Sequence, residues 1–146
     1  FKGGTLIKNE EVLTLKVDVI APFAMEDQIT ARTNAHKIKA KLIVEGANGP
    51  TTANADKILN DKGVTIVPDI LANGGGVTVS YFEWVQNRTG YYYSEDEINK
   101  RADNWMKKAF ENVWQTSVKY KVSMRIAAYI FALEKIEKGI KSRGSY

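Results

Sequence analysis

Two turns of this sequence bring together side chains that can hydrogen-bond a ligand and glycines that let a ligand approach. The first turn, EGANGPTT at residues 45–52, follows the apolar run KLIV, and the second, LANGGG at residues 71–76, follows VTIVPDI. Asn48 and Asn73 present carboxamides, which donate and accept hydrogen bonds at once. Gly46 and the triple glycine leave room for a ligand to lie against the backbone. These residue types predict that both turns belong to a binding cleft.

Short runs of Val and Ile separated by helices predict the sheet that carries these turns. We expect strands at residues 17–24, ending at Pro22, at 41–47 and at 64–70. Such strands, with helices between them, are typical of a parallel sheet covered on its faces. Ligands of these sheets bind where the carboxyl ends of the strands meet. Each turn alone could be a plain loop, but two on one sheet edge favour a ligand site.

Helical periodicity and capping residues predict six helical segments. They cover residues 9–15, 34–40, 52–63, 77–90, 94–120 and 123–136. Asn9 is expected to cap the first, and Ser94 forms a capping box with Glu97 at the start of the fifth. The triple glycine is expected in a turn ahead of the fourth helix. The sixth, nearly all apolar in its middle, is expected to be buried against the fifth.

The helix predicted after the triple glycine presents one further polar candidate. Val77, Ser80, Tyr81 and Trp84 share one face by their three- and four-residue spacing, and Ser80 is its small polar member. Because a helix amino end favours an anion, the Ser80 hydroxyl is placed to donate to a carboxylate. A bond from this hydroxyl back to its own helix is the open alternative. We expect Asn48, Asn73 and Ser80 to converge on one pocket.

The remaining polar residues of note predict no metal site and no nucleophile. His36, the only histidine, lies among Lys and Asn on an expected surface turn, and we interpret it as structural or solvated. Asp69 and Glu83 are isolated acids beside apolar neighbours, and neither has a metal-ligand companion at useful spacing. Either acid could be a buried partner for a base elsewhere.

The composition is that of an ordinary globular protein and narrows its partners. The 146 residues are 44% hydrophobic and 26% charged, with a net charge of +4. Cations alternate with acids in most places, so the charge predicts a solvated surface, not nucleic-acid binding. There is no Cys, which fits a reducing compartment such as the cytoplasm. No apolar run reaches the length of a membrane span, and we expect no membrane partner.

Three segments carry a resemblance to a known family. KLIVEGANGPTT, VPDILANGGGVTVSYFEWVQN and MRIAAYIFALEKI closely resemble the carboxyl-terminal part of hexameric glutamate dehydrogenases. The resemblance runs from about residue 15 to the end of the chain. The sister leucine and phenylalanine dehydrogenases share the fold but are less similar at GPTT and SYFEW.

The resemblance implies a fold and an activity. The fold is α/β, the distal half of a doubly wound Rossmann-type parallel sheet followed by C-terminal helices. Residues 1–90 would complete the dinucleotide-binding domain, and 91–146 would pack on it and hinge to a substrate domain outside this sequence. The activity is that of an oxidoreductase of amino-acid metabolism. It converts L-glutamate to 2-oxoglutarate and ammonia with NAD or NADP, through hydride transfer and hydrolysis of the iminium.

The same resemblance assigns roles to individual residues. Asn48 and Asn73 would contact the nicotinamide half of the cofactor, with the Ala24-Met25 turn and Gly46 beside it. For the substrate, Ser80 would hydrogen-bond the side-chain carboxylate and Val77 would pack next to it.

The resemblance also implies what lies upstream of this sequence. The phosphate-binding glycine fingerprint, the catalytic lysine and the catalytic aspartate of the family belong to that upstream part, so no catalytic residue is expected here. We therefore expect this chain alone to be inactive, its first strand to have an open edge, and its partners to be the rest of its polypeptide and the other subunits of a hexamer. The open alternatives are a sister amino-acid dehydrogenase and a non-catalytic module that binds a nucleotide or another subunit.

Overall fold

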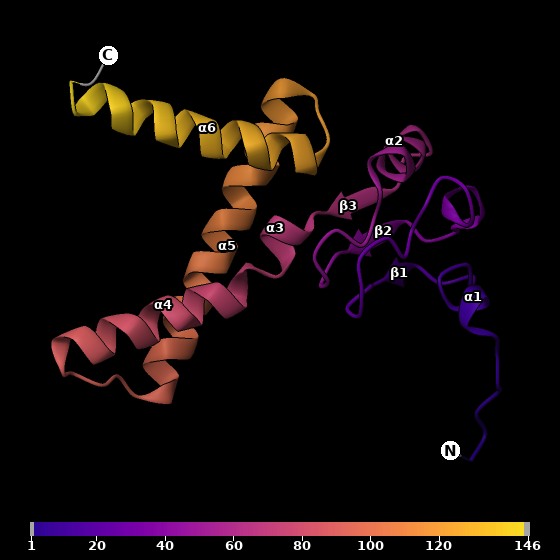
Figure 1. The fold of residues 1–146 in the computed structure, drawn as a ribbon, viewed down its shortest axis with the longest axis horizontal. Coiled ribbons are helices and arrows are strands. Elements are labelled where there is room, and N and C mark those ends of the chain that lie inside the picture. The colour runs from indigo at the N-terminus through magenta and orange to yellow at the C-terminus, as the bar shows by residue number, and fades with distance from the viewer. Residues whose placement is uncertain (1, 145–146) are drawn as a thin grey trace. The chain divides into compact units, whose positions relative to one another are not determined.

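The computed structural model describes residues 2–144, which form two compact units (Figure 1). The first unit ends at Asp69 and the second begins at Ile70. The predicted domain boundary at residue 90 lies inside the second unit, and as a boundary of the whole protein it stays a prediction. Across residues 2–144, no helix combines the length and the apolar character that a membrane span requires.

The first unit is a small α/β layer structure. Its elements are α1 (Asn9–Val12), β1 (Val19–Ile20), the 3₁₀ helix η1 (Ala35–Lys37), β2 (Leu42–Val44), α2 (Ala53–Asp61) and β3 (Thr65–Val67). The three strands are parallel in the order β1-β2-β3, with Ile20 opposite Ile43 and Ile43 opposite Ile66. In residues 2–144 β1 pairs with β2 alone, so its outer border is open, as expected.

The strands are shorter than the apolar runs that predict them. Pro22 and Pro68 follow β1 and β3 closely, and a proline has no N–H to donate to a ladder. The predicted strand 64–70 is wrong at its end, because Asp69–Ala72 forms a short helix, α3. The predicted cap of α1 is also wrong, since Lys8 holds that position and its backbone N–H donates to the Glu11 carboxylate at 3.0 Å.

The core of the first unit lies between the sheet and the segments that cover it. α2 packs against β3 and η1. Leu59 is fully buried and Ile58 partly buried against the core, as predicted, and Gly63 ends the helix region with φ +76°. The buried core residues are Ile20, Ile29, Ala35, Ile38, Ala40, Ile43, Ala55, Leu59, Val64 and Ile66.

The second unit is helical, with α4 (Gly74–Thr89), α5 (Glu95–Tyr120) and α6 (Met124–Ser142). Gly90 ends α4 with φ +71°. The capping box predicted at Ser94 is confirmed, because the Ser94 hydroxyl accepts from the Glu97 amide and the Glu97 carboxylate accepts from the Ser94 amide at 2.9 Å. Ser123 caps α6 by a single bond, in which its hydroxyl accepts from the Ile126 amide at 3.4 Å.

Two expectations for the second unit are corrected. The triple glycine is not a turn before α4, because Gly74–Gly76 form the first turn of that helix. The sixth helix is buried only near its start, at Met124, Ala127 and Ala128, where small side chains let α5 come close. Farther along, α6 leaves α5 (Figure 1), and apolar side chains such as Leu133 are 63% exposed.

Candidate functional site

Hydrogen bonds join the turns at the carboxyl ends of β1 and β2. The backbone amides of Gly46 and Ala47 both donate to the Pro22 carbonyl, at 3.0 and 2.9 Å. Farther along, the Asp27 amide donates to the Gly49 carbonyl at 2.9 Å, and the Ile29 amide to the Pro50 carbonyl at 2.8 Å. The segment carrying Ala24 and Met25 and the segment carrying Asn48 therefore run side by side.

Tight backbone geometry shapes these two turns. Asp27 and Gly49, which are bonded to each other, have φ of +53° and +57°, in the left-handed region. Asp tolerates that region better than most residues, and Gly enters it without steric cost. The Phe23 ring lies against the Cα of Gly46, where a side chain at 46 would overlap it. The glycine predicted to admit a ligand thus admits the Phe23 ring.

The predicted residues at this sheet edge are amide and apolar, and the exposed acids Glu26 and Asp27 follow them in the turn after β1. The Asn48 side chain is exposed, and Phe23 and Met25 are 72% and 59% exposed. Together the predicted residues of the first unit, Ala24, Met25, Gly46 and Asn48, offer no formal charge. They suit a flat ligand that has both an apolar face and hydrogen-bonding groups.

Two acids, Glu45 and Asp69, accept hydrogen bonds from backbone amides at this edge, a role that was not predicted from the sequence. Glu45 is fully buried, and its Oε2 accepts from the Asp69 amide at 2.9 Å. Asp69 Oδ2 in turn accepts from the Gly49 amide at 2.8 Å. The signal in the sequence is an acid that ends an otherwise apolar strand run, followed 24 residues later by an acid after Val-Pro.

In the second unit, the predicted residues lie along one side of α4. Asn73 is the N-cap residue, and Val77, Ser80 and Trp84 follow at helical spacing; Val77 is 71% and Trp84 57% exposed. The opposite side of the helix packs inward through Phe82, which is buried. The predicted residues of this unit therefore share an exposed face. Convergence of Asn48 with Asn73 and Ser80 stays a prediction.

The open question about the Ser80 hydroxyl has an answer in this structure. Its Oγ donates to the Gly76 carbonyl at 3.1 Å, which is the bond back to its own helix. Thr78 makes the equivalent bond to the Gly74 carbonyl at 2.8 Å. A Ser hydroxyl has one proton and rotates freely, so the Ser80 bond is exchangeable for one to a ligand.

Aromatic side chains brace the exposed face of α4. The Tyr81 ring stacks on Trp84 and on Trp105 of α5, with centroids 6.0 and 5.7 Å apart, and Phe82 meets Trp105 edge-on. Arg88 lies over the Trp84 ring. Offset stacking of this kind fixes ring orientation beyond what burial alone gives, so the part of α4 from Tyr81 to Trp84 is held against α5.

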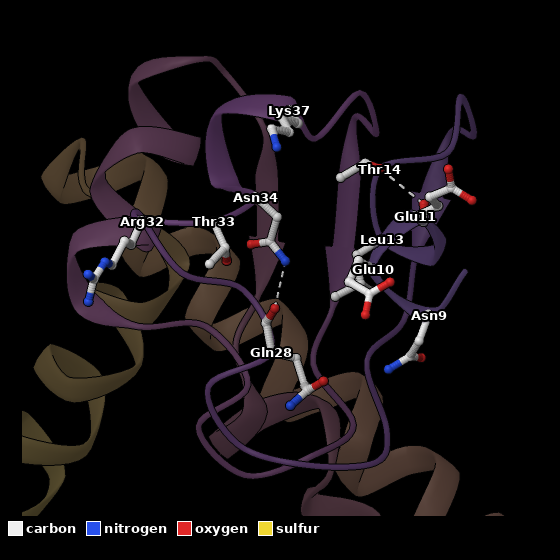
Figure 2. Close-up of a pocket in the computed structure, with 10 residues that line it drawn as sticks. All are labelled: Asn9, Glu10, Glu11, Leu13, Thr14, Gln28, Arg32, Thr33, Asn34 and Lys37. Atoms are coloured by element: carbon white, nitrogen blue, oxygen red, sulfur yellow. Dashed lines mark hydrogen bonds between the residues drawn. The ribbon is translucent and has the colours of Figure 1, made fainter. Parts of the chain in front are cut away.

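A separate hollow of about 650 Å³ lies beside α1 in the first unit (Figure 2). Hydrogen bonds line it, including one from the side-chain Nδ2 of Asn34 to the Gln28 backbone carbonyl at 2.8 Å. Its lining mixes acids and bases and contains none of the predicted site residues. The lining residues are Asn9, Glu10, Glu11, Leu13, Thr14, Gln28, Arg32, Thr33, Asn34 and Lys37.

Three side chains with shifted pKa values, Glu97, Lys119 and Glu137, lie on the helices of the second unit, and none of them is a predicted site residue. The Ser94 backbone amide lowers the pKa of Glu97, and the Lys141 ammonium lowers the pKa of Glu137. A hydrogen bond with Tyr120 raises the pKa of Lys119. The predicted site residues are amides, a hydroxyl, glycine and apolar side chains, so what they can offer a ligand is hydrogen bonds and shape.

Comparison with known proteins places the chain. The model of the Glutamate/Leucine/Phenylalanine/Valine dehydrogenase family matches residues 1–144. The catabolic NAD-specific glutamate dehydrogenase RocG of Bacillus subtilis is 52% identical over 139 residues, which are 95% of this chain and 32% of that protein.

Solved structures agree with the sequence relatives. Glutamate dehydrogenase from Peptoniphilus asaccharolyticus superposes with a TM-score of 0.82 at 45% identity, over 86% of this chain and 32% of that one. Hetero-hexameric glutamate dehydrogenase from Thermus thermophilus, in a Leu-bound form, gives 0.86 at 31% identity, over 94% and 33%. The chain thus spans about a third of the length of these relatives. With its α/β fold and parallel sheet, it is a member of the Glutamate/Leucine/Phenylalanine/Valine dehydrogenase family.

Proposed function

We propose that this chain is part of an oxidoreductase that converts L-glutamate to 2-oxoglutarate and ammonia with NAD or NADP. The observation that carries the proposal is the similarity of nearly the whole chain to an NAD-specific glutamate dehydrogenase at 52% identity. The exposed side chains of Met25 and Asn48 in the first unit support it, because a nicotinamide ring has an apolar face and a carboxamide.

The residues of the first unit would bind the cofactor. The Asn48 carboxamide both donates and accepts, so it pairs with the carboxamide of a nicotinamide. Ala24 and Met25 would supply apolar contact beside it. Gly46 has no side chain and therefore leaves the space in which the Phe23 ring lies. These residues would orient the cofactor, which when bound would supply the acceptor for a hydride from the substrate's α-carbon.

The residues of the second unit would bind the substrate and one further part of the cofactor. Asn73 would contact the nicotinamide half, and Val77 would pack against the substrate's methylene groups. The Ser80 hydroxyl would leave the Gly76 carbonyl and donate to the side-chain carboxylate of glutamate. A hydrogen bond to a charged group is worth about 1.5–3 kcal/mol, more than the bond to a neutral carbonyl that it replaces.

The proposal extends to the assembly and its setting. The partners would be the rest of the same polypeptide, which carries the catalytic lysine and aspartate, and further subunits in a homo-hexamer. The proposed location is the cytoplasm, which is consistent with the proposed substrate and with a sequence that has no Cys.

The test is a substrate panel on the full-length protein. Reduction of NAD and of NADP is followed by the absorbance of the reduced nicotinamide, with L-glutamate, L-leucine and L-phenylalanine as substrates. We expect glutamate to give the highest kcat/KM by more than about a hundred-fold, since a carboxylate partner left unpaired is costly. Preference for leucine or phenylalanine would identify a sister dehydrogenase, and no turnover with any of them would refute the proposal.

A further inference from the structure

Glu45 is an acid in the interior of the first unit. It follows β2 directly, and strand alternation places its side chain on the same face as Ile43. Both residues are 0% exposed. Burial of an acid away from water is costly unless its oxygens accept hydrogen bonds. The position of Glu45 is therefore maintained by the bonds that it makes.

A relay of hydrogen bonds leads from Glu45 to the turn that carries Asn48. The Glu45 carboxylate accepts from the backbone amide of Asp69 at 2.9 Å, which fixes Asp69 where β3 gives way to α3. The Asp69 carboxylate then accepts from the backbone amide of Gly49 at 2.8 Å. Glu45 is thus linked to Gly49 through Asp69.

The relay closes the turn on itself. Glu45 begins the turn and also bonds through its own amide to the Val67 carbonyl at 3.1 Å. Gly49 ends the turn, with φ +57°, and its carbonyl is held by the Asp27 amide at 2.9 Å. Asn48 lies just before this fixed residue and is exposed. Bonds on the residues that flank Asn48 therefore fix the turn in which this exposed residue lies.

We propose that Glu45 and Asp69 are positioning residues that hold Asn48 in its ligand-binding orientation, an inference that rests on the proposed function for the role of Asn48. Neither acid touches the cofactor in this scheme. They act by removing the freedom of the turn before binding, and freedom that is already lost does not have to be lost when the ligand binds.

The experiment uses the full-length protein and two independent measurements. Asp69→Ala removes the acceptor for the Gly49 amide, and Asp69→Asn keeps an acceptor oxygen at the same place. Asp18→Asn is the matched control, because Asp18 is an exposed acid whose Lys41 partner lies at the start of β2. Hydrogen exchange is followed in fragments covering residues 45–50 and 53–61, and the Kd of NAD and NADP is measured by titration.

The proposal expects a local effect with rescue. Asp69→Ala should speed exchange in residues 45–50 and leave exchange in the α2 fragment unchanged. It should also raise the Kd of the preferred cofactor by about ten-fold. Asp69→Asn should restore most of the slow exchange and most of the cofactor affinity. Asp18→Asn should match the wild type in both measurements. Should Asp69→Ala not fold, Asp69→Ser takes its place, since its hydroxyl is too short to reach the Gly49 amide.

Two results would overturn the positioning role. One is exchange in residues 45–50 that stays at the wild-type rate in Asp69→Ala or Asp69→Ser. The other is a wild-type cofactor Kd in either variant while Asn48→Ala binds weakly. Failure of the proposed function looks different, because the wild type itself would then bind neither cofactor, and the exchange rates would still decide whether Asp69 holds the turn.

Discussion

The Phe23 ring occupies the space that the Cβ of any other residue would take at Gly46. The two residues lie on neighbouring turns, and the Gly46 amide is bonded to the carbonyl of Pro22, the residue before Phe23. The absence of a side chain at 46 therefore sets where an exposed aromatic ring lies at the candidate cofactor edge. This contact leads to the first prediction.

Gly46→Ala should impair cofactor binding more than folding. The added methyl group forces the Phe23 ring outward, and because that ring is 72% exposed it can swing into solvent without unpacking the core. We expect the KM for the cofactor to rise by about ten-fold with a small change in Tm. The double variant Phe23→Ala with Gly46→Ala should recover part of the loss, and equal losses in the single and double variants would contradict this account.

Ser80→Ala, in the full-length enzyme, should lower kcat/KM for glutamate by about ten- to a hundred-fold, because a bond to the substrate carboxylate is lost. Thr78→Val is the matched control. Its hydroxyl makes the same kind of bond to a glycine carbonyl of α4, at 2.8 Å, yet Thr78 is not on the exposed face. Similar kinetics for the two variants would mean that both hydroxyls serve only the helix.

Glu97 should stabilise the start of α5 in a pH-dependent way. Its pKa lies below the ordinary value of 4.5 because the Ser94 amide donates to it, so the stabilising bond is fully present above 4.5 and is lost as the pH falls through the lowered pKa. A peptide of residues 91–122 should be more helical by circular dichroism than its Glu97→Gln variant at pH 7. The difference in helix content should vanish at a pH below the lowered pKa of Glu97. Glu95→Gln, which changes a first-turn charge without the capping bond, should show a smaller difference at pH 7.

Thr51→Val should leave stability unchanged or raise it by up to about 1 kcal/mol. The Thr51 hydroxyl oxygen is buried and, within the described part of the chain, has no hydrogen-bond partner, so a methyl group of the same shape removes a desolvation cost. Thr52→Val is the neighbouring control, since the Thr52 hydroxyl donates to the Ile29 carbonyl at 3.4 Å. Urea unfolding of the two variants should rank Thr51→Val above Thr52→Val, and the reverse order would contradict the interpretation.

Local rules predicted the parts of this fold that local chemistry decides. The capping box at Ser94, the cap at Ser123 and the inward side of α2 follow from residue type and spacing. The rule that parallel strands end at one edge also brought the turn after β1 next to the turn after β2. The reason is that a cap or a strand order depends on few neighbours.

Two of the errors arose where residues distant in sequence decide, and one arose within a single helix. Glycine disfavours helix, so the sequence predicts a turn at residues 74–76, but the carbonyls of Gly74 and Gly76 accept the Thr78 and Ser80 hydroxyls within α4. The pairing of Glu45 with Asp69 joins residues 24 positions apart and appears only when the sheet is assembled. The burial expected along α6 requires a neighbouring surface, and α5 covers only its beginning.

The glycine start of α4 sets how that helix opens. Each glycine in a helix is about 1 kcal/mol less favourable than alanine, so the first turn costs little to unwind compared with the turns that follow. The amides of residues 78–80 bond to the carbonyls of Gly74–Gly76 in a regular helix. Their hydrogens should therefore exchange with solvent well before those near Phe82, by fraying from one end. The face that carries Val77 and Ser80 thus begins on the softest turn of its helix, and it can adjust to a ligand without disturbing the aromatic packing below.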